Sequence, residues 1–511
     1  MKTFKCLIAL LLLVTNTSFA QTKASVNLDS LDAYYDKMVK DWDLPSASIG
    51  IVKDGELVFI GNYGVKEVGK EDGPDQFTLY AIASNSKAFT SAVIGMLVQE
   101  GKLDWDDKVQ KYLPYFAVYD DWVSEHTTIR DLLSHRIGLG TFSGDNIWYK
   151  SDQTAEAMIK NIKYVPQAYE FRAGYGYSNL MYITAGELIR TVTGKTWGEN
   201  VEERILKPLG MNRSIYSLSD LERKGNYAMP HMRKEDKNIA IDWTDWEEVA
   251  ATGGLISSVA DISKWMIFNM NNGIHGADTL LTAATRNTVW TPHNNFVVDH
   301  TKPNPYGSHF RGYGLGWSLG DYHGKMRVSH TGGYDGMITA VTMIPEENLG
   351  IVVLTNGTNS PIMAATYYGL DQYLGEETKD WSSYYLDRAN TYKANDTRIS
   401  DRIAQRELHT KPSLSEMEIS GDYHSDLVGQ ISILKIDNKL KLVFEHHPLL
   451  SATLTHWNYD TYLINWDEDH AWFSFGTIRF NSNEKKEVLG FDFDVPNDDF
   501  FFEELKPRKI E

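Results

Sequence analysis

The chain has 511 residues, of which 42% are hydrophobic, and it carries a formal net charge of −19. A chain of this length and composition has room for two or three domains with real cores. The acidic balance disfavours a nucleic-acid surface, and solubility outside the cytoplasm is its simplest explanation.

The first twenty residues have the pattern of a secretory signal peptide. Lys2 and Lys5 precede an apolar run over residues 7–14, and Ser18-Phe19-Ala20 offers a small-x-small cleavage site. Cleavage would remove these two lysines, lowering the net charge from −19 to −21, together with Cys6, the sole cysteine. We therefore expect a periplasmic or secreted protein with no thiol chemistry and, because no later segment is long enough, no integral membrane segment after cleavage.

The motif Ser84-Asn85-Ser86-Lys87 can make a nucleophile. An apolar stretch over residues 79–83 leads into it, and apolar residues then recur at helical spacing over residues 89–97, until Gly101. Ser84 is therefore predicted to lie in the first turn of a helix, where backbone N–H groups and the helix dipole favour developing negative charge. Lys87, one turn on, can reach the serine hydroxyl, as in a Ser/Lys hydrolase.

Two further Ser-x-x-Lys matches show that the motif alone is weak. Ser432 and Lys435 lie in an alternating strand that sends them to opposite faces. Ser482 and Lys485 lie in a polar loop with nothing to hold it in place. The prediction for Ser84 therefore depends on its partners.

Tyr177-Ser178-Asn179 supplies possible partners. It follows a glycine-punctuated loop over residues 171–176 and precedes a predicted helix over residues 180–192. A phenol beside a lysine ammonium is a workable general base, because nearby positive charge lowers the pKa of the phenol. Asn179 can donate its amide to the lysine or to substrate. The alternative for Tyr177 is a packing residue with a satisfied hydroxyl.

His330-Thr331-Gly332-Gly333 is the third motif. Strands predicted over residues 325–329, 336–344 and 350–355 form an antiparallel sheet, with a turn over residues 345–348. The two glycines would let a substrate backbone lie close to the strand and leave an N–H group free for an oxyanion. A simple hairpin is the alternative.

Competing chemistry has little support in the sequence. The chain has no Gly-x-Ser-x-Gly elbow, no His-Glu-x-x-His, no Walker loop and no dinucleotide fingerprint, and its 15 histidines show no metal-ligand spacing. No cofactor and no metal are predicted. His446-His447 falls in a predicted loop, where a solvated pair is expected.

Together, the three motifs resemble those of the penicillin-recognising serine hydrolases, in particular the class C β-lactamase and D-alanyl-D-alanine carboxypeptidase group. The resemblance covers roughly residues 30–375 and includes three further stretches, at residues 132–139, 253–258 and 314–317. It implies that Ser84 is acylated and that Lys87 and Tyr177 share proton transfer. Asn179 would position Lys87 or the substrate amide, His330, Thr331, Gly332 and Gly333 would bind substrate, and the N–H groups of Ser84 and Gly333 would form the oxyanion hole.

Two positions depart from the family pattern. His330 stands where such β-lactamases usually carry lysine, and an ordinary histidine is mostly neutral at pH 7. Its imidazolium would bind a substrate carboxylate only at lower pH, which shifts the prediction away from a dedicated β-lactamase. Ile137 replaces a frequent serine and is expected to be structural, as is His135, which we expect to be a buried hydrogen-bonding residue.

The last quarter of the chain is predicted to be a separate module. Residues 376–415 are charged and helix-prone, and short strands are predicted over residues 430–434, 439–444, 461–466, 472–480 and 488–495. Residues 416–511 resemble the lipocalin-like domain of some family members, which implies a small antiparallel β barrel. Most of its aromatics are expected to fill the barrel, whereas loops such as 446–448 and 457–459 could cover the catalytic cleft.

The predicted protein thus has a β-lactamase-related serine hydrolase domain over residues 21–375. Its expected fold class is α/β (α+β), with an antiparallel sheet flanked by helices. A helical connector over residues 376–415 and a C-terminal β barrel over residues 416–511 are expected to follow. We expect a secreted serine hydrolase that acts through an acyl-enzyme on small-molecule or peptide substrates, as a peptidase or amidase on D-amino-acid-type peptides. A carboxylesterase or β-lactamase of the same fold is an alternative, and a non-catalytic penicillin-binding-like sensor or scaffold is an alternative of another class. The sequence leaves the oligomeric state open.

Overall fold

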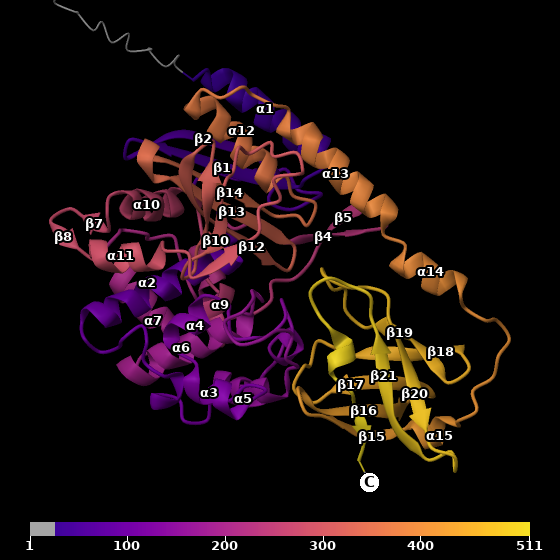
Figure 1. The fold of residues 1–511 in the computed structure, drawn as a ribbon. Coiled ribbons are helices and arrows are strands. Elements are labelled where there is room, and N and C mark those ends of the chain that lie inside the picture. The colour runs from indigo at the N-terminus through magenta and orange to yellow at the C-terminus, as the bar shows by residue number, and fades with distance from the viewer. Residues whose placement is uncertain (1–25, 511) are drawn as a thin grey trace, which may run out of the picture.

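The structure, a computed structural model, describes residues 26–510, so the predicted signal peptide over residues 1–20 lies outside the described residues. The fold has three parts: an eight-stranded sheet, a cluster of helices below it, and a closed barrel of eight strands beside that cluster (Figure 1). Within residues 26–510, no helix combines the length and the apolar character that crossing a bilayer requires.

The large sheet is antiparallel throughout and is covered by helices on both faces. Ile49 and Ile51 point to the layer formed by α1 (Leu28–Asp41) and α12 (Ile362–Leu374). Gly50 points the other way and lies so close to α10 (Val259–Met270) that a Cβ there would meet Val259 Cγ1 at 2.5 Å. In spatial order the strands are β2 (Glu56–Gly64), β1 (Ser46–Lys53), β14 (Leu349–Thr355), β13 (Met337–Ile344), β12 (Lys325–Tyr334), β11 (Ser318–Tyr322), β10 (Arg311–Tyr313) and β9 (Asn294–Phe296).

The helical cluster surrounds α2 (Ser86–Gln99), which follows Ser84. Residues 86–97 of α2 are all buried, which its nearly continuous run of small and apolar residues permits. The neighbouring helices are α3 (Asp121–His126), α4 (Ile129–Leu133), α5 (Ala155–Asn161), α6 (Asn179–Thr193), α7 (Trp197–Val201), α8 (Leu221–Lys224), α9 (Ala250–Gly253) and α11 (Ala283–Val289). Three short strand pairs complete this part: β3 (Tyr80–Ala81) with β6 (Ile256–Ser257), β4 (His231–Lys234) with β5 (Lys237–Ala240), and β7 (Ile274–His275) with β8 (Asp278–Thr279).

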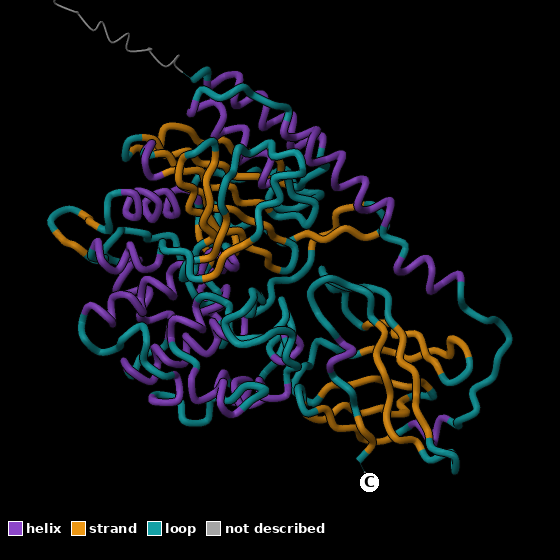
Figure 2. The backbone as a smooth tube through the Cα atoms, viewed as in Figure 1, coloured by secondary structure: helices purple, strands orange, loops and turns teal. Residues whose placement is uncertain are grey.

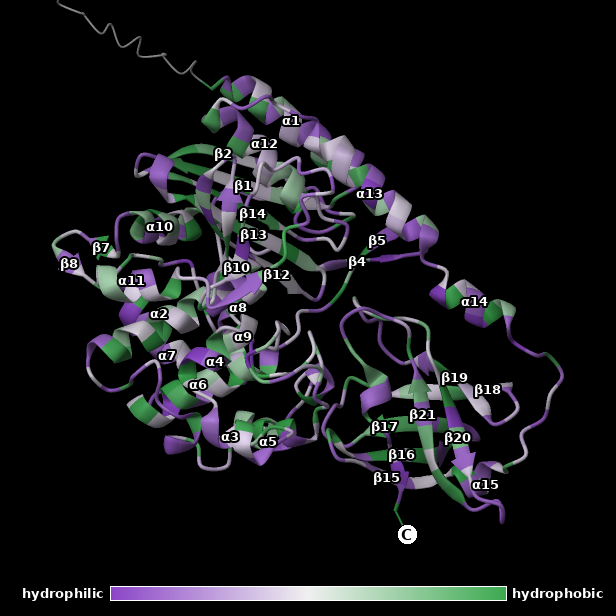
Figure 3. Ribbon diagram, in the orientation of Figure 1, coloured by the Kyte–Doolittle hydropathy of each residue, from purple (hydrophilic) through white to green (hydrophobic). Residues whose placement is uncertain are grey.

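Two helices lead from the sheet to the barrel. In α13 (Trp381–Asn395) only Trp381 and Ser382 are buried, and the rest of the helix presents mainly hydrophilic residues (Figure 3). After α14 (Arg398–Ala404) the chain runs without regular structure to α15 (Glu416–Ile419). The predicted helical connector is therefore helical over its first two thirds.

The barrel strands pair in chain order and long loops join several of them (Figure 2). Alternate residues such as Ile431, Ile433, Phe491 and Phe493 point into its core, as the period-2 pattern predicts. The strands are β15 (Gly421–Ser425), β16 (Gly429–Ile436), β17 (Lys439–Phe444), β18 (Ala452–Asn458), β19 (Thr461–Trp466), β20 (Thr477–Ser482), β21 (Val488–Asp494) and β22 (Arg508–Lys509).

The predicted antiparallel sheet with flanking helices and the predicted C-terminal barrel are both confirmed. The strand predicted over residues 472–480 is wrong in its first half, because β20 begins at Thr477 and residues 467–476 form a loop. Strands β15, β18 and β22 were not predicted. The loop before β20 proves important, since it reaches the candidate active site.

Candidate active site

Ser84 lies in a strained turn. It occupies a 3₁₀ turn over Ala83–Asn85, directly before α2 rather than inside that helix as predicted. Ala83 has φ of 46°, a left-handed conformation that costs a non-glycine residue about 1–3 kcal/mol. Asn85 Nδ2 fixes the turn by donating to Ile82 O at 3.0 Å and to Thr339 Oγ1 of β13 at 2.9 Å. The Ser84 side chain is the one partly exposed side chain in this segment.

Lys87 lies behind Ser84, fully buried. Its Nζ is 3.0 Å from Ser84 Oγ and donates to Asn179 Oδ1 and to Thr252 O, each at 2.8 Å. Burial holds the pKa of Lys87 well below its usual range, although the nearby Asp145 works in the other direction. A neutral amine has two N–H groups and one lone pair. The two carbonyl oxygens take both N–H groups, so the lone pair is directed to the Ser84 hydroxyl.

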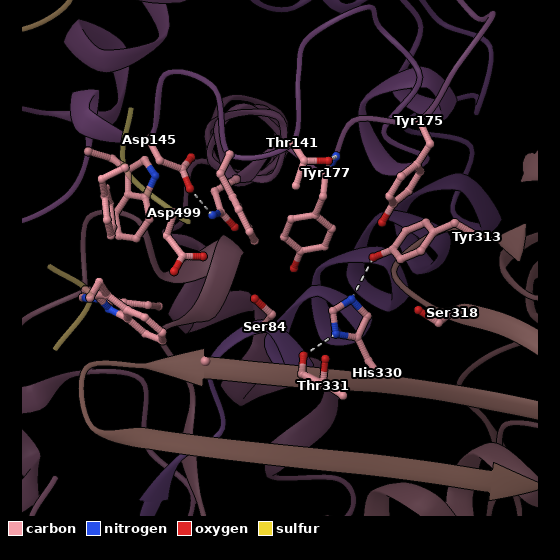
Figure 4. A pocket seen from close by; sticks show the side chains of 17 residues that line it. Ser84, Thr141, Asp145, Tyr175, Tyr177, Tyr313, Ser318, His330, Thr331 and Asp499 are labelled. Carbon is pink, nitrogen blue, oxygen red and sulfur yellow. Dashed lines mark hydrogen bonds between the residues drawn. The ribbon is translucent and has the colours of Figure 1, made fainter. Parts of the chain in front are cut away.

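The Tyr177 ring lies beside Lys87, with its hydroxyl directed toward Ser84 (Figure 4). Lys87 Nζ is 4.8 Å from the centroid of this ring. Burial raises the pKa of Tyr177 well above 10, and its contact with the Ser84 hydroxyl offsets only part of that rise. The expectation that lysine lowers the pKa of this phenol is therefore wrong, because desolvation by burial is the largest influence on it.

His330 of β12 faces the same cavity as a neutral imidazole. Its Nδ1 donates to Thr331 O at 2.6 Å, and its Nε2 accepts from the Tyr313 hydroxyl at 2.9 Å. Burial, with Lys87 nearby, lowers the pKa of His330 to about 3. An imidazolium that binds a substrate carboxylate, which the sequence allowed at lower pH, is therefore disfavoured by burial until the pH is far below neutral.

Asn179 links Lys87 to a carboxylate that the sequence analysis missed. Its Oδ1 accepts from Lys87 Nζ and, at 2.8 Å, from Thr252 Oγ1, and its Nδ2 donates to Asp145 Oδ2 at 2.6 Å. Burial raises the pKa of Asp145 to about 7. Asp145 lies in the loop before α5, at no recognisable motif position, so only the tertiary structure reveals it.

The glycine pair of the third motif lets β12 lie against the nucleophile turn. A Cβ on Gly332 would meet Ile82 O at 2.2 Å and Ala83 Cβ at 3.0 Å. A Cβ on Gly333 would meet Trp472 Cη2, from the C-terminal barrel, at 3.1 Å. Glycine is therefore required at Gly332 by the close approach of the catalytic turn, whereas Gly333 lies beside an indole of the other part of the molecule.

A cavity of about 390 Å³ opens above Ser84, between the barrel and the catalytic part, by which we mean the large sheet and the helical cluster together. The predicted residues Ser84, Tyr177, Asn179, His330, Thr331 and Gly333 line it. Trp472, Asp499 and Phe500 of the barrel complete its wall. The loops that cover the cleft are thus the one before β20 and the one after β21, rather than the predicted residues 457–459, and Trp472 lines the cavity instead of the barrel core.

The predicted loop pair His446-His447 lies where the barrel meets the catalytic part. His447 is buried, and its Nδ1 lies 2.9 Å from Tyr149 O, so the expected solvated pair is wrong for this residue. His446 is partly exposed and lies 3.1 Å from Asp152 Oδ1.

The other residues that the sequence singled out lie where a structural role requires. His135 is buried and its Nδ1 accepts from Ser178 N at 3.1 Å, and Ile137 is buried in the core. Ser432 donates to Asp422 at 2.6 Å and Lys435 pairs with Glu416 at 2.8 Å, far along the chain from Ser84. Across residues 26–510, no group of three or more His, Cys, Asp or Glu is arranged to hold a metal ion.

Comparisons with known proteins place this site in a wider context. The family described as Beta-lactamase matches residues 31–374, and the Domain of unknown function (DUF3471) matches residues 405–509. The chain is 28% identical over 443 residues to the unguisins hydrolase ungD' of Aspergillus campestris, covering 80% of this chain and 78% of that protein. It is 30% identical over 432 residues to the unguisins hydrolase ungD of Aspergillus violaceofuscus, covering 78% and 74%.

Among solved structures, the octameric penicillin-binding protein homologue from Pyrococcus abyssi is similar in fold. Its TM-score is 0.61 at 20% sequence identity, and the match covers 92% of this chain and 98% of that one.

Proposed function

Because the chain belongs to the beta-lactamase family, we propose that it is a serine hydrolase that forms an acyl-enzyme on Ser84 and releases it to water. The observation that carries the proposal is the 3.0 Å contact between Lys87 Nζ and Ser84 Oγ, with both N–H groups of the neutral amine held by other acceptors. A lone pair directed at a serine hydroxyl is what a general base needs.

In the proposed first step, Ser84 Oγ attacks the substrate carbonyl carbon as Lys87 Nζ takes the hydroxyl proton. The negative charge that develops on the carbonyl oxygen is received by the N–H groups of Ser84 and Gly333. Gly332 brings β12 against the nucleophile turn, which sets the distance between these two donors.

Tyr177 has a separate role in this proposal. Since its raised pKa keeps the phenol protonated, Tyr177 can donate a proton to the departing nitrogen or oxygen. Lys87 then returns its proton through Tyr177, and a water molecule attacks the ester carbon, with Lys87 again accepting a proton. As that second intermediate collapses, the bond from the carbonyl carbon to Ser84 Oγ breaks, Lys87 returns the proton to Ser84 Oγ, and the carboxylic acid product is released.

The substrate we propose is a peptide or related amide of the D-amino-acid type. Two relatives are named as hydrolases of unguisins, which supports hydrolytic chemistry in chains of this kind. The neutral His330 favours a peptidase or amidase over a dedicated β-lactamase. We also propose that residues 416–511 form a module that limits which substrates enter, since Trp472, Asp499 and Phe500 form part of the cavity wall.

A hydrolysis screen tests the reaction class. D-peptides, short acyl esters and a chromogenic cephalosporin should be assayed together, alongside covalent labelling by a fluorophosphonate and a fluorescent penicillin. We expect labelling of Ser84 and turnover of at least one amide. Turnover of esters alone would support an esterase instead, and a folded protein that takes no label would support the non-catalytic sensor or scaffold.

We further propose that residues 1–20 direct the chain to a periplasmic or extracellular location. The charged start, apolar run and small-residue site in this segment support that route. Mass spectrometry of the protein from its native host should find an N-terminus after Ala20. An N-terminus at Met1 in the mature protein would contradict export by this signal.

A further inference from the structure

Two carboxylates from different parts of the molecule lie on one side of the nucleophile. Asp145 belongs to the catalytic part and Asp499 to the loop after β21, and both line the cavity on the side of Ser84 opposite Tyr313 and His330 (Figure 4). The proximity of Asp499 adds to the rise in the pKa of Asp145, so the two groups repel each other when both are ionised.

Neither carboxylate is fully used by the protein. Asp145 Oδ2 accepts from Asn179, and the indole of Trp148 also acts on this carboxylate and lowers its pKa, whereas Asp145 Oδ1 is buried and accepts no hydrogen bond of full geometry within the described residues. The Asp145 side chain lines the cavity although only 2% of the residue is exposed. Such a buried, unpartnered carboxylate oxygen is costly unless a ligand completes it.

Large aromatic side chains surround the same end of the cavity. The indoles of Trp148, Trp246 and Trp472 and the ring of Phe500 all line it. Trp148 and Trp246 pack edge to face, with ring centroids 5.1 Å apart. Aromatic faces beside carboxylates make a site that attracts cations, because the ring quadrupole and the anionic oxygens act in the same direction.

No side chain of the opposite charge balances these carboxylates inside the cavity. The described residues that line it include no lysine or arginine, and His330 is neutral. Lys87 approaches Asn179 from behind, and its pKa lies well below the usual range. The cavity therefore has an acidic end, and Lys87 behind Asn179 offsets part of its charge.

We propose that this end of the cavity is a subsite for a positively charged group of the substrate, a protonated amine held between Asp145 and Asp499 against the indoles. This subsite adds a cationic group to the proposed substrate class, and its role in catalysis rests on the proposed function. The amine donates to the Asp145 and Asp499 carboxylates. It thus binds only when the barrel is docked, because Asp499 comes from the barrel.

Calorimetric titration of the full chain with 2-phenylethylamine and with 2-phenylethanol, its neutral counterpart, tests the subsite without any turnover. We expect the amine to bind at least about tenfold more tightly at pH 7.5, as charge-assisted hydrogen bonds and a cation–π contact predict. Equal affinity of the two compounds for the wild-type protein would overturn the inference.

Two variants and one independent assay complete the test. Asp499→Asn should abolish the preference for the amine, whereas Glu503→Gln, which removes the same charge from an exposed side chain nearby, should keep it. A preference that survives in folded Asp499→Asn also contradicts the subsite. Fluorophosphonate labelling of Ser84 reports on the proposed function separately: amine binding without labelling would sink the hydrolase proposal alone, and labelling without amine preference would sink the subsite alone.

Discussion

The bonding of Lys87 decides the chemistry at the scale of single residues. A lysine ammonium has three N–H donors and no lone pair, so it could not accept the proton of the Ser84 hydroxyl. Burial makes the ammonium costly, and two carbonyl acceptors fit the two N–H groups of the neutral amine. Burial has the opposite effect on the pKa of neighbouring Tyr177 and keeps it protonated, so in the proposed mechanism this pair supplies both a base and an acid.

Replacing Ser84 by alanine should abolish covalent labelling and lower kcat by roughly 10⁴-fold or more, since the attacking oxygen is removed. Labelling with a fluorophosphonate and steady-state kinetics measure both effects. Ser432→Ala and Ser482→Ala, at the two other Ser-x-x-Lys matches, should retain wild-type rates. An adduct that still forms on the Ser84 variant would show that the nucleophile lies elsewhere.

The pH dependence of acylation should reveal the neutral lysine. The base acts only when unprotonated, so the rate falls as pH falls through the pKa of Lys87, and the lowered pKa moves this limb well below pH 10.5. With a neutral substrate we expect stopped-flow acylation rates to level off well below pH 10.5. A rate that keeps rising to pH 10 would contradict a neutral Lys87.

The same position tests the need for a lone pair. Lys87→Arg places a permanently protonated group behind Ser84 and should lower the acylation rate by roughly 10²–10⁴-fold. Lys102→Arg, on an exposed side chain after α2, is the matched control and should change nothing.

Strand β12 and the 3₁₀ turn of Ser84 are the two elements whose contact sets the geometry of the proposed oxyanion hole. Hydrogen bonds from Asn85 and Thr339 join the turn to the sheet, and Gly332 allows β12 to approach Ile82 O. The left-handed Ala83 is kept in its strained conformation by this contact. The position of β12 and the strain in the turn at Ala83 therefore depend on each other.

Gly332→Ala tests this contact between elements. A Cβ there would sit 2.2 Å from Ile82 O, so strand and turn must separate, and kcat/KM should fall by about 10²-fold, as for misplacement by an ångström or so. The assay is run at 25 °C after a melting curve confirms a folded protein. Gly73→Ala, in an exposed loop where the nearest atom is 3.4 Å away, should have wild-type kcat/KM. Similar loss in both variants would point to a general effect of folding.

At the scale of the whole molecule, the interface between the barrel and the catalytic part completes the cavity. Glu504 of the barrel accepts from Ser143 Oγ at 2.5 Å and from Gly144 N at 2.8 Å, directly before Asp145. Tyr149 and Phe500 pack with ring centroids 4.2 Å apart across the same boundary. The barrel thus supports the loop that carries Asp145 and adds its own side chains to the wall, so it acts on the site as well as on stability.

Trp472→Ala tests the effect of the barrel on substrate choice. Removing this indole from above Gly333 should widen the cavity and change the ranking of large against small substrates at least about threefold in kcat/KM, because large aromatics carry much of the contact energy in such sites. Trp457→Ala is the control, since Trp457 lies on the barrel against Arg406, with the guanidinium 4.1 Å from the ring. An unchanged ranking in folded Trp472→Ala would limit the barrel to a structural role.

The sequence by itself determined the fold class and the motif residues, because hydrophobic periodicity and three short motifs depend on local order along the chain. Ser84, Lys87, Tyr177, Asn179 and His330 were all predicted; the structure places four of them around one cavity and buries Lys87 directly behind Ser84. Only the tertiary structure decided how far each pKa moves, since desolvation depends on what lies around a group: it reversed the expected direction for Tyr177 and lowered the pKa of His330 to about 3. It alone also placed Asp145 beside Asp499 and Trp472 over Gly333, because these pairs are joined across hundreds of residues by the docking of the barrel, which no local pattern records.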